Sequence, residues 1–209
     1  MQIIETPENI PPLTGPISLA IGNFDGVHPG HLYLISELKK RGLPAIITFR
    51  NHPAHVLYPE HFFAEHLRAA RQPFIEKGRF LTHVSVYGPP PLLSSLEEKL
   101  HLLESAGVEL VILLSFTPDM ALITYDAFLK NVKKHLPFQT FIAGKGDTFG
   151  FQRQGTEERV KALESELNFE AIYIEKLKFQ GKTISSTRIR QLIASGQIAD
   201  AQTLINTRF

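Results

Sequence analysis

Two histidines three residues apart, His28 and His31, lie in the glycine-containing stretch GNFDGVHPGH at residues 22–31. Residues 17–21 before this stretch form an apolar run of strand length, and the residues after it have helical periodicity. Pro29 suits the first position of a helix, where its missing N–H is not needed. The pattern therefore predicts a strand, a tight turn and a helix N-terminus whose first turn carries both imidazoles on one side.

This geometry favours the binding of an anion. The first backbone N–H groups of a helix have no partner within the helix, and the helix dipole adds about half a positive charge there. Phosphate is a natural occupant of such a position. The imidazoles of His28 and His31 can donate hydrogen bonds to phosphate oxygens as negative charge develops. A loop with two surface histidines is the simpler alternative.

A second segment with phosphate-binding character is ISSTRIR, at residues 184–190. Ser185, Ser186 and Thr187 stand at a predicted helix start, where hydroxyl groups cap the helix or bind phosphate. The arginines that follow, Arg188 and Arg190, can grip phosphate oxygens with two parallel hydrogen bonds. Together these groups suit a triphosphate, although alone the segment also fits an ordinary helix cap with surface arginines.

The two segments are far apart in sequence, but each is a strand-to-helix junction. In a parallel sheet all such junctions emerge at the carboxyl edge of the strands, where ligands bind. We therefore expect the His28–His31 pair and the Ser185–Arg190 cluster to converge on one nucleotide. The sequence contains no GxxxxGK[ST] motif, which argues against a P-loop kinase.

The rest of the chain supplies the elements that would position these groups. Residues 43–49 form a second apolar strand, so the beginning of the chain is a βαβ unit. The other expected elements are a helix capped by Ser94 with Glu97 or by Ser95 with Glu98, a central strand at 108–116, a helix at 119–136 interrupted near Thr124, a strand at 140–143, a helix from Thr156 to 168, a strand at 171–177 and a helix ending at 195. Residues 1–16 appear irregular. The order predicts an α/β fold, Rossmann-like, with a parallel sheet and helices on both faces.

Composition excludes several classes of protein. The 209 residues include 43% hydrophobic residues, enough for one folded domain over residues 1–209. A net charge of +1 gives no case for a nucleic-acid partner, and the absence of cysteine excludes disulfides and thiolate metal sites. Because no leader or long apolar span is visible, we expect a cytoplasmic protein without a membrane partner or a metal site of its own.

The two segments carry a family resemblance. HPGH matches the HxGH signature of adenylyl-transferring enzymes, and the whole stretch 22–31 resembles bacterial FAD synthetases, the adenylyltransferase half of bifunctional riboflavin kinase/FAD synthetases. ISSTRIR resembles the ISSTxxR motif of that family, with Arg190 at the matching position. The resemblance implies the nucleotidyltransferase fold, the substrates FMN and Mg²⁺-ATP, and the products FAD and pyrophosphate. It also implies that His28, His31 and Arg190 are catalytic.

The resemblance further implies two sets of binding residues. Those for ATP are Gly22, Asn23, Phe24, Asp25, Gly26, His28, His31, Gly144, Asp147, Ser185, Ser186, Thr187 and Arg190. Those for the flavin are Phe49, His52 and Pro53, in a segment similar to the family's TFxxHP, with Phe149 and Gly150. The last two belong to the glycine-rich loop 144–155, which departs from the family: Gly146 stands where an Asp is expected, and Asp147 comes one place late.

Two further departures concern the extent of the chain. Residues 60–88 read as an insertion, with a helix at 60–70 and a strand at 83–87, and could act as a lid, an oligomer contact or a surface appendage. No riboflavin kinase domain follows residue 209, so the kinase is expected to be separate or missing from the sequence. Two alternative functions stay open: a nucleotidyltransferase with another phosphate acceptor, and a flavin- or nucleotide-binding module without catalysis.

Overall fold

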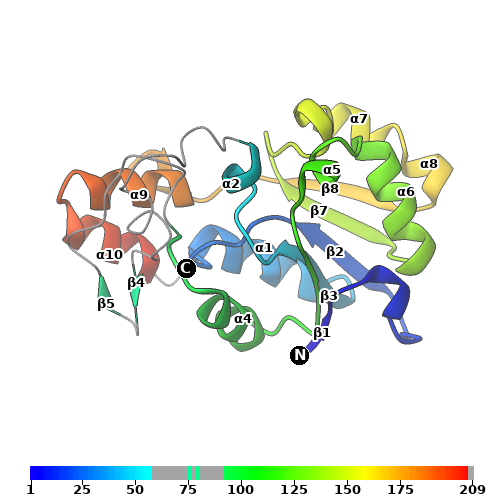
Figure 1. Ribbon diagram of the computed structural model, residues 1–209, viewed down its shortest axis with the longest axis horizontal. Helices are drawn as coiled ribbons and strands as arrows, with labels where there is room; N and C mark the ends of the chain where they lie inside the picture. The colour runs from blue at the N-terminus through cyan, green and yellow to red at the C-terminus, as the bar shows by residue number, and fades with distance from the viewer. Residues whose placement is uncertain (58–74, 77–78, 81–91, 207–209) are drawn as a thin grey trace. The chain divides into compact units, whose positions relative to one another are not determined.

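The computed structural model describes residues 1–57, 75–76, 79–80 and 92–206 of the chain (Figure 1). The chain divides into two compact units. The first, here the sheet unit, comprises residues 1–22, 34–50 and 107–175, and the second, here the helical unit, comprises residues 23–33, 51–106 and 176–209. Whether residues 1–209 behave as a single domain stays a prediction.

A six-stranded parallel sheet forms the centre of the sheet unit, in the order β1-β6-β3-β2-β7-β8. Its strands are β1 (Gln2–Ile4), β2 (Ile17–Ile21), β3 (Leu43–Phe49), β6 (Leu110–Leu114), β7 (Thr140–Gly144) and β8 (Glu170–Ile174). The predicted strands at 17–21 and 43–49 are confirmed with the same bounds. The parallel pairing confirms the predicted α/β class, because parallel neighbours must be joined by crossover connections.

Strand β2 is the point at which the strand order changes direction. The chain leaves β2 for β3 on one side, and later returns to place β7 on the other side of β2. In open α/β sheets, ligands bind beyond the carboxyl end of strands at such a point. The stretch 22–31 follows directly after this end of β2.

Helices cover both faces of the sheet. On one face, α6 (Tyr125–His135), α7 (Glu157–Lys161) and α8 (Glu164–Leu167) bury apolar residues against the strands. On the other face, the Ser18 hydroxyl donates to the Leu38 carbonyl of α1 (Pro29–Lys39) over 2.8 Å. The two faces are served by alternate residues of β2, since successive side chains of a strand point in opposite directions. The predicted covering of both faces is therefore confirmed.

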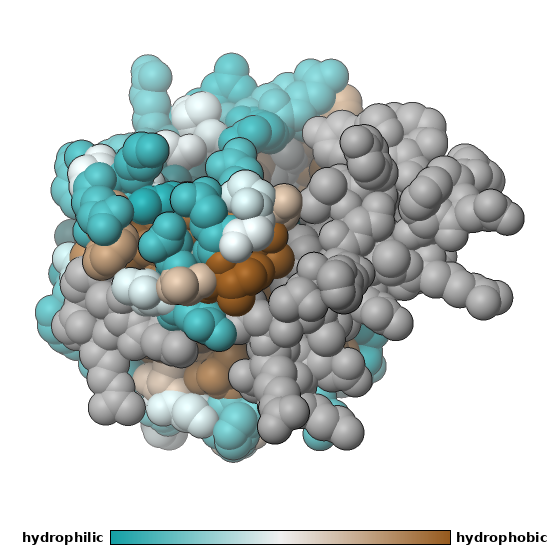
Figure 2. Space-filling model, turned by 90° about the vertical axis from the view of Figure 1, so that its left-hand side faces the viewer, coloured by the Kyte–Doolittle hydropathy of each residue, from teal (hydrophilic) through white to brown (hydrophobic). Residues whose placement is uncertain are grey.

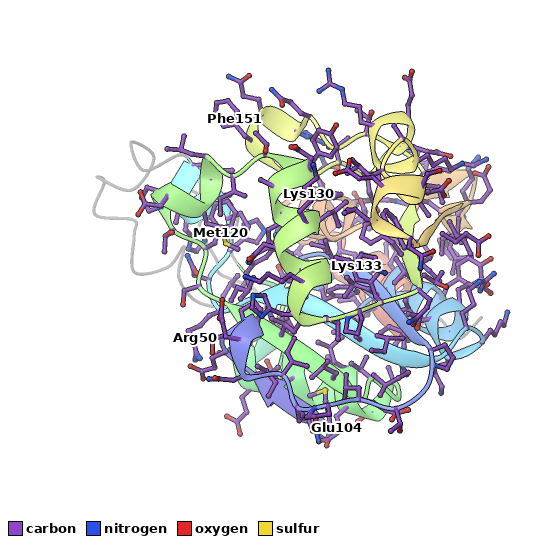
Figure 3. All side chains as sticks on the ribbon, turned by 90° about the vertical axis from the view of Figure 1, so that its right-hand side faces the viewer. Arg50, Glu104, Met120, Lys130, Lys133 and Phe151 are labelled. Atoms are coloured by element: carbon purple, nitrogen blue, oxygen red, sulfur yellow. The ribbon has the colours of Figure 1, made fainter. Side chains whose placement is uncertain are left out.

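Helix α6 is also fastened to its neighbours by two lysines that Figure 3 labels along its length. Lys130 forms a 2.7 Å ion pair with Glu166 of α8. Lys133 donates to the carbonyls of Phe138 and Asn168, the second over 2.8 Å. The predicted break before α6 is confirmed, because α5 (Pro118–Ala121) ends before Thr124. Thr124 occupies the N-cap position of α6 without donating or accepting a side-chain cap bond.

Two expectations for the sheet were wrong. The first residues are not irregular throughout, because β1 pairs with β6 and a 3-10 turn, η1 (Pro7–Asn9), follows it. The apolar strand predicted at 108–116 is shorter, and β6 lies next to the edge strand β1 instead of at the centre. It is nevertheless almost fully buried, because helices cover both faces of the sheet.

The helical unit is built mainly from short helices around a small core. Its elements are the part of α1 up to Tyr33, α2 (Ala54–Leu57), α4 (Leu96–Ser105), α9 (Ser186–Ala194), α10 (Ile198–Asn206) and the strand pairs β4 (Ile75–Glu76) with β5 (Arg79–Phe80) and β9 (Lys178–Phe179) with β10 (Lys182–Thr183). Figure 1 shows α9 and α10 side by side, and the core between them includes Leu93, Ile189 and Leu204. Among the coloured residues of the face in Figure 2, hydrophilic side chains surround a smaller apolar area.

Parts of the predicted insertion lie outside the described residues. These include the helix expected at 60–70 and the strand expected at 83–87. Within the part of the chain that the structure describes, no helix has the length and apolar character needed to span a membrane.

Candidate phosphate-binding site

The turn after β2 has a backbone that few sequences tolerate. Phe24 has φ = 49° and Val27 has φ = 34°, although residues with a Cβ rarely adopt positive φ and β-branched residues do so least. Gly26, with φ = 76°, also packs tightly: a Cβ there would lie 2.9 Å from the Leu93 Cβ. Strained backbone of this kind is concentrated at functional sites, where surrounding contacts maintain it.

The turn delivers the two histidines into contact with each other. Their rings are stacked at 3.8 Å between centroids with an interplanar angle of 12°, and the Phe24 ring lies 5.0 Å from that of His31. Burial, together with the nearby Arg190 charge, lowers the pKa of His28 to about 4. Burial, followed by the charges of His28 and Lys99, places the pKa of His31 well below its ordinary value. Both rings are therefore neutral at pH 7.

Each of these rings has a nitrogen without a partner. The Nδ1 atoms of His28 and His31 are buried and have no hydrogen-bond partner among the described residues. A buried polar group left in this condition costs about 1–3 kcal/mol. Such groups in a folded protein call for an explanation, and a polar ligand is one of the usual ones.

Gly30, between the two histidines in HPGH, leaves room for the first of them. A Cβ at this position would lie 3.1 Å from His28 Cε1 and 3.2 Å from His28 Nδ1. These separations are shorter than ordinary van der Waals contact, so a side chain at residue 30 would displace the imidazole. The glycine of the motif is thus explained by the position of the ring beside it.

Gly30→Ala is expected to lower FAD formation, measured as proposed below, by about 10- to 100-fold. The added Cβ would shift the His28 ring by well under 1 Å, and small shifts of a catalytic group are enough to slow a reaction. The urea unfolding free energy should change by less than about 1 kcal/mol, since alanine is the better helix former and offsets part of the crowding. Ser36→Ala, at an exposed position of α1, is the matched control. Unchanged turnover in Gly30→Ala would contradict this role of the glycine.

Asp25 connects the turn to two other segments of the helical unit. Its carboxylate is 4% exposed and accepts hydrogen bonds from the backbone N–H of Leu93 (2.9 Å) and of Ser94 (3.2 Å). It also forms an ion pair and hydrogen bond with the guanidinium of Arg190. Gly26 N–H donates to the Ser94 hydroxyl over 3.1 Å. Asp25 therefore holds the turn, the start of α4 and α9 together.

Helix α9 brings the ISSTRIR segment to this turn. The Ser185 hydroxyl caps the helix by accepting from the Arg188 N–H (3.2 Å), and the Ser186 hydroxyl donates to the Asp25 carbonyl (2.9 Å). Arg188 donates to the carbonyls of Phe179 and Lys182 in the β9–β10 pair, whereas Arg190 reaches Asp25. The structure thus brings together the two segments that we expected to converge. Thr187 is exposed at the start of the same helix.

His52, predicted for the flavin, lies beside the same turn. Its Nε2 is 3.1 Å from the Asn23 side-chain amide, and its Nδ1 accepts from the Ala54 N–H over 3.1 Å. Burial, together with the charges of Arg190, His55 and Lys99, lowers its pKa to about 3, so the ring is neutral at pH 7. Pro53, also predicted for the flavin, begins the turn that leads into α2.

The structure adds Lys99 and Ser94 to the residues around the turn. Lys99 is 8% exposed and its ammonium donates to the Asn23 carbonyl over 3.4 Å. The sequence carries a signal for it, because Lys99 lies three residues after Leu96 and four before Leu103, on the apolar side of α4. A lysine on the apolar side of a helix is rarely buried unless charged or polar groups pair with it.

The other predicted site residues belong to the sheet unit. Asp147 accepts from the Gly144 N–H over 3.0 Å, so its carboxylate closes the turn after β7. The Phe149 ring packs against Phe141 at 5.8 Å, and a Cβ on Gly150 would lie 2.5 Å from the Tyr125 backbone nitrogen. Gly22 donates its N–H to Ile47, and the Phe49 ring meets that of Phe116 edge-on. The ligand-binding roles of these residues stay predictions.

Three neutral histidines of this site, of which His28 is buried and His31 and His52 are half-buried, make the stability of the protein depend on pH. In the unfolded chain, histidine binds a proton near pH 6.5, whereas folded His28 and His52 bind one only near pH 4 and pH 3. Between these values the unfolded state holds more protons, so stability falls as pH falls. We expect the free energy of unfolding in urea to drop from pH 7 to pH 5 by up to about 1.4 kcal/mol per pH unit for each such group.

His52→Gln tests this expectation, because it removes one titrating group while keeping a polar side chain. Its unfolding free energy should fall less steeply between pH 7 and pH 5 than that of the unaltered protein. His101→Gln, on the exposed side of α4, should leave the slope unchanged. Equal slopes in all three proteins would contradict the burial of neutral His52.

The described residues include no group of three or more His, Cys, Asp or Glu side chains able to hold a metal ion. The buried carboxylate nearest the histidines, Asp25, is already bonded to Arg190 and to two backbone N–H groups. This donor set suits Mg²⁺ that arrives bound to phosphate oxygens, as Mg²⁺ commonly does, better than a protein cage.

The chain combines a parallel α/β fold with an HxGH turn that is bonded to a helix start carrying hydroxyl groups and an arginine. A sequence model described as FAD synthetase matches residues 11–188. The chain therefore belongs to the FAD synthetase family.

Two relatives share 30% identity with this chain, the bifunctional riboflavin kinase/FMN adenylyltransferases of Bacillus subtilis (strain 168) and Escherichia coli (strain K12). The matches cover 90% and 91% of this chain but 52% and 54% of those proteins. The chain thus spans about half the length of these relatives.

Solved structures agree with the fold. A crystal structure named macrolide-efflux protein, from Streptococcus pneumoniae, is 25% identical with a TM-score of 0.73, covering 98% of this chain and 61% of that one. A pantoate-beta-alanine ligase from Francisella tularensis, 14% identical with a TM-score of 0.54, shares the fold, covering 96% of this chain and 79% of that one.

Proposed function

We propose that this chain is an FMN adenylyltransferase that makes FAD and pyrophosphate from FMN and Mg²⁺-ATP. The observation that carries the proposal is the bonding of the two phosphate-binding segments through Asp25, which contacts Arg190 and Ser186 of α9. Membership of the FAD synthetase family supports the choice of FMN as acceptor. The cytoplasmic location and the whereabouts of a riboflavin kinase stay predictions.

In the proposed reaction an oxygen of the FMN phosphate attacks the α-phosphorus of ATP in line. The new bond joins this oxygen to the α-phosphorus, and the bond between the α-phosphorus and the bridging oxygen to the β-phosphorus breaks. Pyrophosphate leaves with that bridging oxygen and its electron pair. No protein nucleophile is needed, so catalysis consists of positioning and charge stabilisation. Mg²⁺, bound to the phosphate oxygens, offsets their negative charge.

The neutral rings of His28 and His31 serve as N–H donors to the α- and β-phosphate oxygens as charge builds up. Being neutral, each imidazole offers one N–H group, and their stacking fixes both rings relative to the helix start. Pre-oriented donors of this kind stabilise developing charge without reorganising during the reaction.

The β- and γ-phosphates are assigned to Arg190, Thr187 and Ser186. The guanidinium has five N–H groups in a planar fork, so its bond to Asp25 orients the fork without exhausting its donors. The Ser186 hydroxyl donates to the Asp25 carbonyl in this structure, and it would have to rotate to donate to phosphate. His52, which lies beside Asn23 of the same turn, is assigned to the flavin side of the reaction.

The test is to incubate the protein with Mg²⁺-ATP and FMN and to measure FAD by chromatography and pyrophosphate by a coupled assay. We expect the two products in equal amounts. The matched incubations replace FMN with 4′-phosphopantetheine or nicotinamide mononucleotide. A dinucleotide from either of these instead of FMN would identify a transferase with another acceptor. Binding of FMN and ATP without product would identify a non-catalytic module.

A further inference from the structure

Lys99 is a buried cation that the mechanism above does not use. It belongs to α4, whose start is fixed by a capping box: Ser95 Oγ accepts from the Glu98 N–H, and the Glu98 carboxylate accepts from the Ser95 N–H. The two residues before the cap, Leu93 and Ser94, donate their backbone N–H groups to Asp25. The bonds at the start of α4 thus set the place of Lys99 relative to the turn at residues 23–27.

The surroundings of Lys99 are the groups of the phosphate site. Its ammonium donates to the Asn23 carbonyl over 3.4 Å, and the Asp25 carboxylate stabilises its charge. Its charge in turn disfavours protonation of His31, from α1, and of His52, from the segment after β3. Lysine is almost never buried to this degree unless it is paired, because removing an ammonium from water is costly.

The carbonyl that Lys99 contacts belongs to the residue just before the strained part of the turn. Asn23 immediately precedes Phe24, which with Val27 is one of the two non-glycine turn residues at positive φ. A strained turn persists only when its surroundings hold it in place. The Lys99 bond holds this turn at Asn23, and the bonds of Asp25 and Gly26 to residues 93 and 94 hold it at the residues that follow.

We propose that Lys99 is a positioning residue for adenylyl transfer, whose ammonium holds the Asn23 carbonyl and so fixes the turn that carries His28 and His31. The proposal rests on the proposed function. Lys99 acts through the turn and through the electrostatic effect of its charge on His31, and no contact with substrate is required of it.

If Lys99 has this role, enzyme activity should fall at alkaline pH. Burial lowers the pKa of Lys99 to about 8, with the Asp25 charge opposing the shift. Above that pH the amine loses its charge, and its hydrogen bond to the Asn23 carbonyl weakens. The described charged or titratable groups facing it include Asp25, His31 and His52, with Arg190 paired to Asp25. The pKa values of the two histidines are shifted far below 8, and substrate phosphates complete their ionisation near pH 6.

The first experiment measures kcat/KM for FMN between pH 6.5 and 10 in the unaltered protein, Lys99→Arg and Lys99→Met. The unaltered protein should lose activity with a midpoint near pH 8, because kcat/KM reports groups of the free enzyme. Lys99→Arg, which stays charged, should keep measurable activity and move the midpoint upward by at least one pH unit. Lys99→Met should lower kcat about 10- to 100-fold at pH 7 and show no midpoint near 8.

Lys130→Met is the matched control, because Lys130 lies at the surface of α6 in an ion pair with Glu166. It should leave both kcat/KM and its pH profile unchanged. If Lys99→Met fails to fold, the decision rests on Lys99→Arg. An alkaline midpoint that stays near 8 in Lys99→Arg, or a Lys99→Met protein with more than half of the original kcat, would overturn the proposal.

A second measurement does not depend on activity. The pH titration of the lysine ¹³Cε resonances in the ligand-free protein should show one signal with a midpoint near pH 8 that disappears in Lys99→Arg. Absence of such a signal would contradict the buried position of the amine whether or not FAD is formed. Failure of the unaltered protein to make FAD from FMN, with the signal present, would instead overturn the proposed function.

Discussion

Replacing His31 with alanine is expected to lower kcat for FAD formation by about 100- to 1000-fold while the protein stays folded. This is the effect of removing one pre-oriented donor that acts on charge developing in a transition state. His31 suits that role because its ring is held between His28, stacked at 3.8 Å, and Phe24 at 5.0 Å. A ring fixed by two neighbours loses little freedom when the phosphate arrives.

The fold should survive this change because His31 contributes little to stability as a polar group. Its buried Nδ1 has no partner among the described residues, so its removal also removes an unsatisfied group. The measurements are kcat at saturating FMN and Mg²⁺-ATP, and urea unfolding of the same preparation. His101→Ala, exposed on α4, is the control. Turnover near that of the unaltered protein would count heavily against His31 as a catalytic residue.

Replacing Arg190 with methionine should have the largest combined effect on stability and activity. The change leaves the Asp25 carboxylate buried with its backbone donors but without its direct ion-pair partner. Breaking a buried ion pair by removing one partner typically costs about 3–5 kcal/mol. FAD formation should become undetectable or fall at least 1000-fold, since the proposed ligand of the leaving pyrophosphate and the anchor of α9 are lost together.

A double-mutant cycle separates these two losses. Asp25→Asn removes the buried negative charge, so Arg190→Met in that background should cost much less unfolding free energy than it does alone. Activity should not recover in the double variant, because the guanidinium is still missing. Arg159→Met, at an exposed position, controls for the loss of an arginine. Recovery of activity along with stability would show that Arg190 acts only as a partner of Asp25.

Arg188 and Arg190 illustrate what sequence reasoning can and cannot resolve. Both are arginines in the first turns of one predicted helix, and only the resemblance to the ISSTxxR motif favoured Arg190. In the structure Arg188 binds the carbonyls of the β9–β10 pair, while Arg190 meets Asp25. Side chains two positions apart on a helix point in nearly opposite directions. The neighbours that each of them meets come from distant parts of the chain.

Features with local causes were predictable from the sequence alone. The strand, turn and helix around residues 17–39, the Ser95–Glu98 capping box, the break before α6 and the Ser185 cap follow from apolar periodicity and from hydrogen bonds between residues a few positions apart. These inferences required no knowledge of which distant side chains meet. The two phosphate-binding segments also meet, as expected, but not for the expected reason, because residues 184–190 follow the antiparallel pair β9–β10 and not a strand of the parallel sheet.

Only the tertiary structure decided the place of β1, the position of β6 beside it, and the partners of Asp25 and Lys99. The three residues of β1 are stabilised by pairing with a strand more than 100 positions away, and no local sequence pattern predicts that pairing. Asp25 meets Arg190 across 165 positions, and Lys99 meets Asn23 across 76. Such contacts depend on how whole elements pack, so their residue types are visible in the sequence while their partners are not.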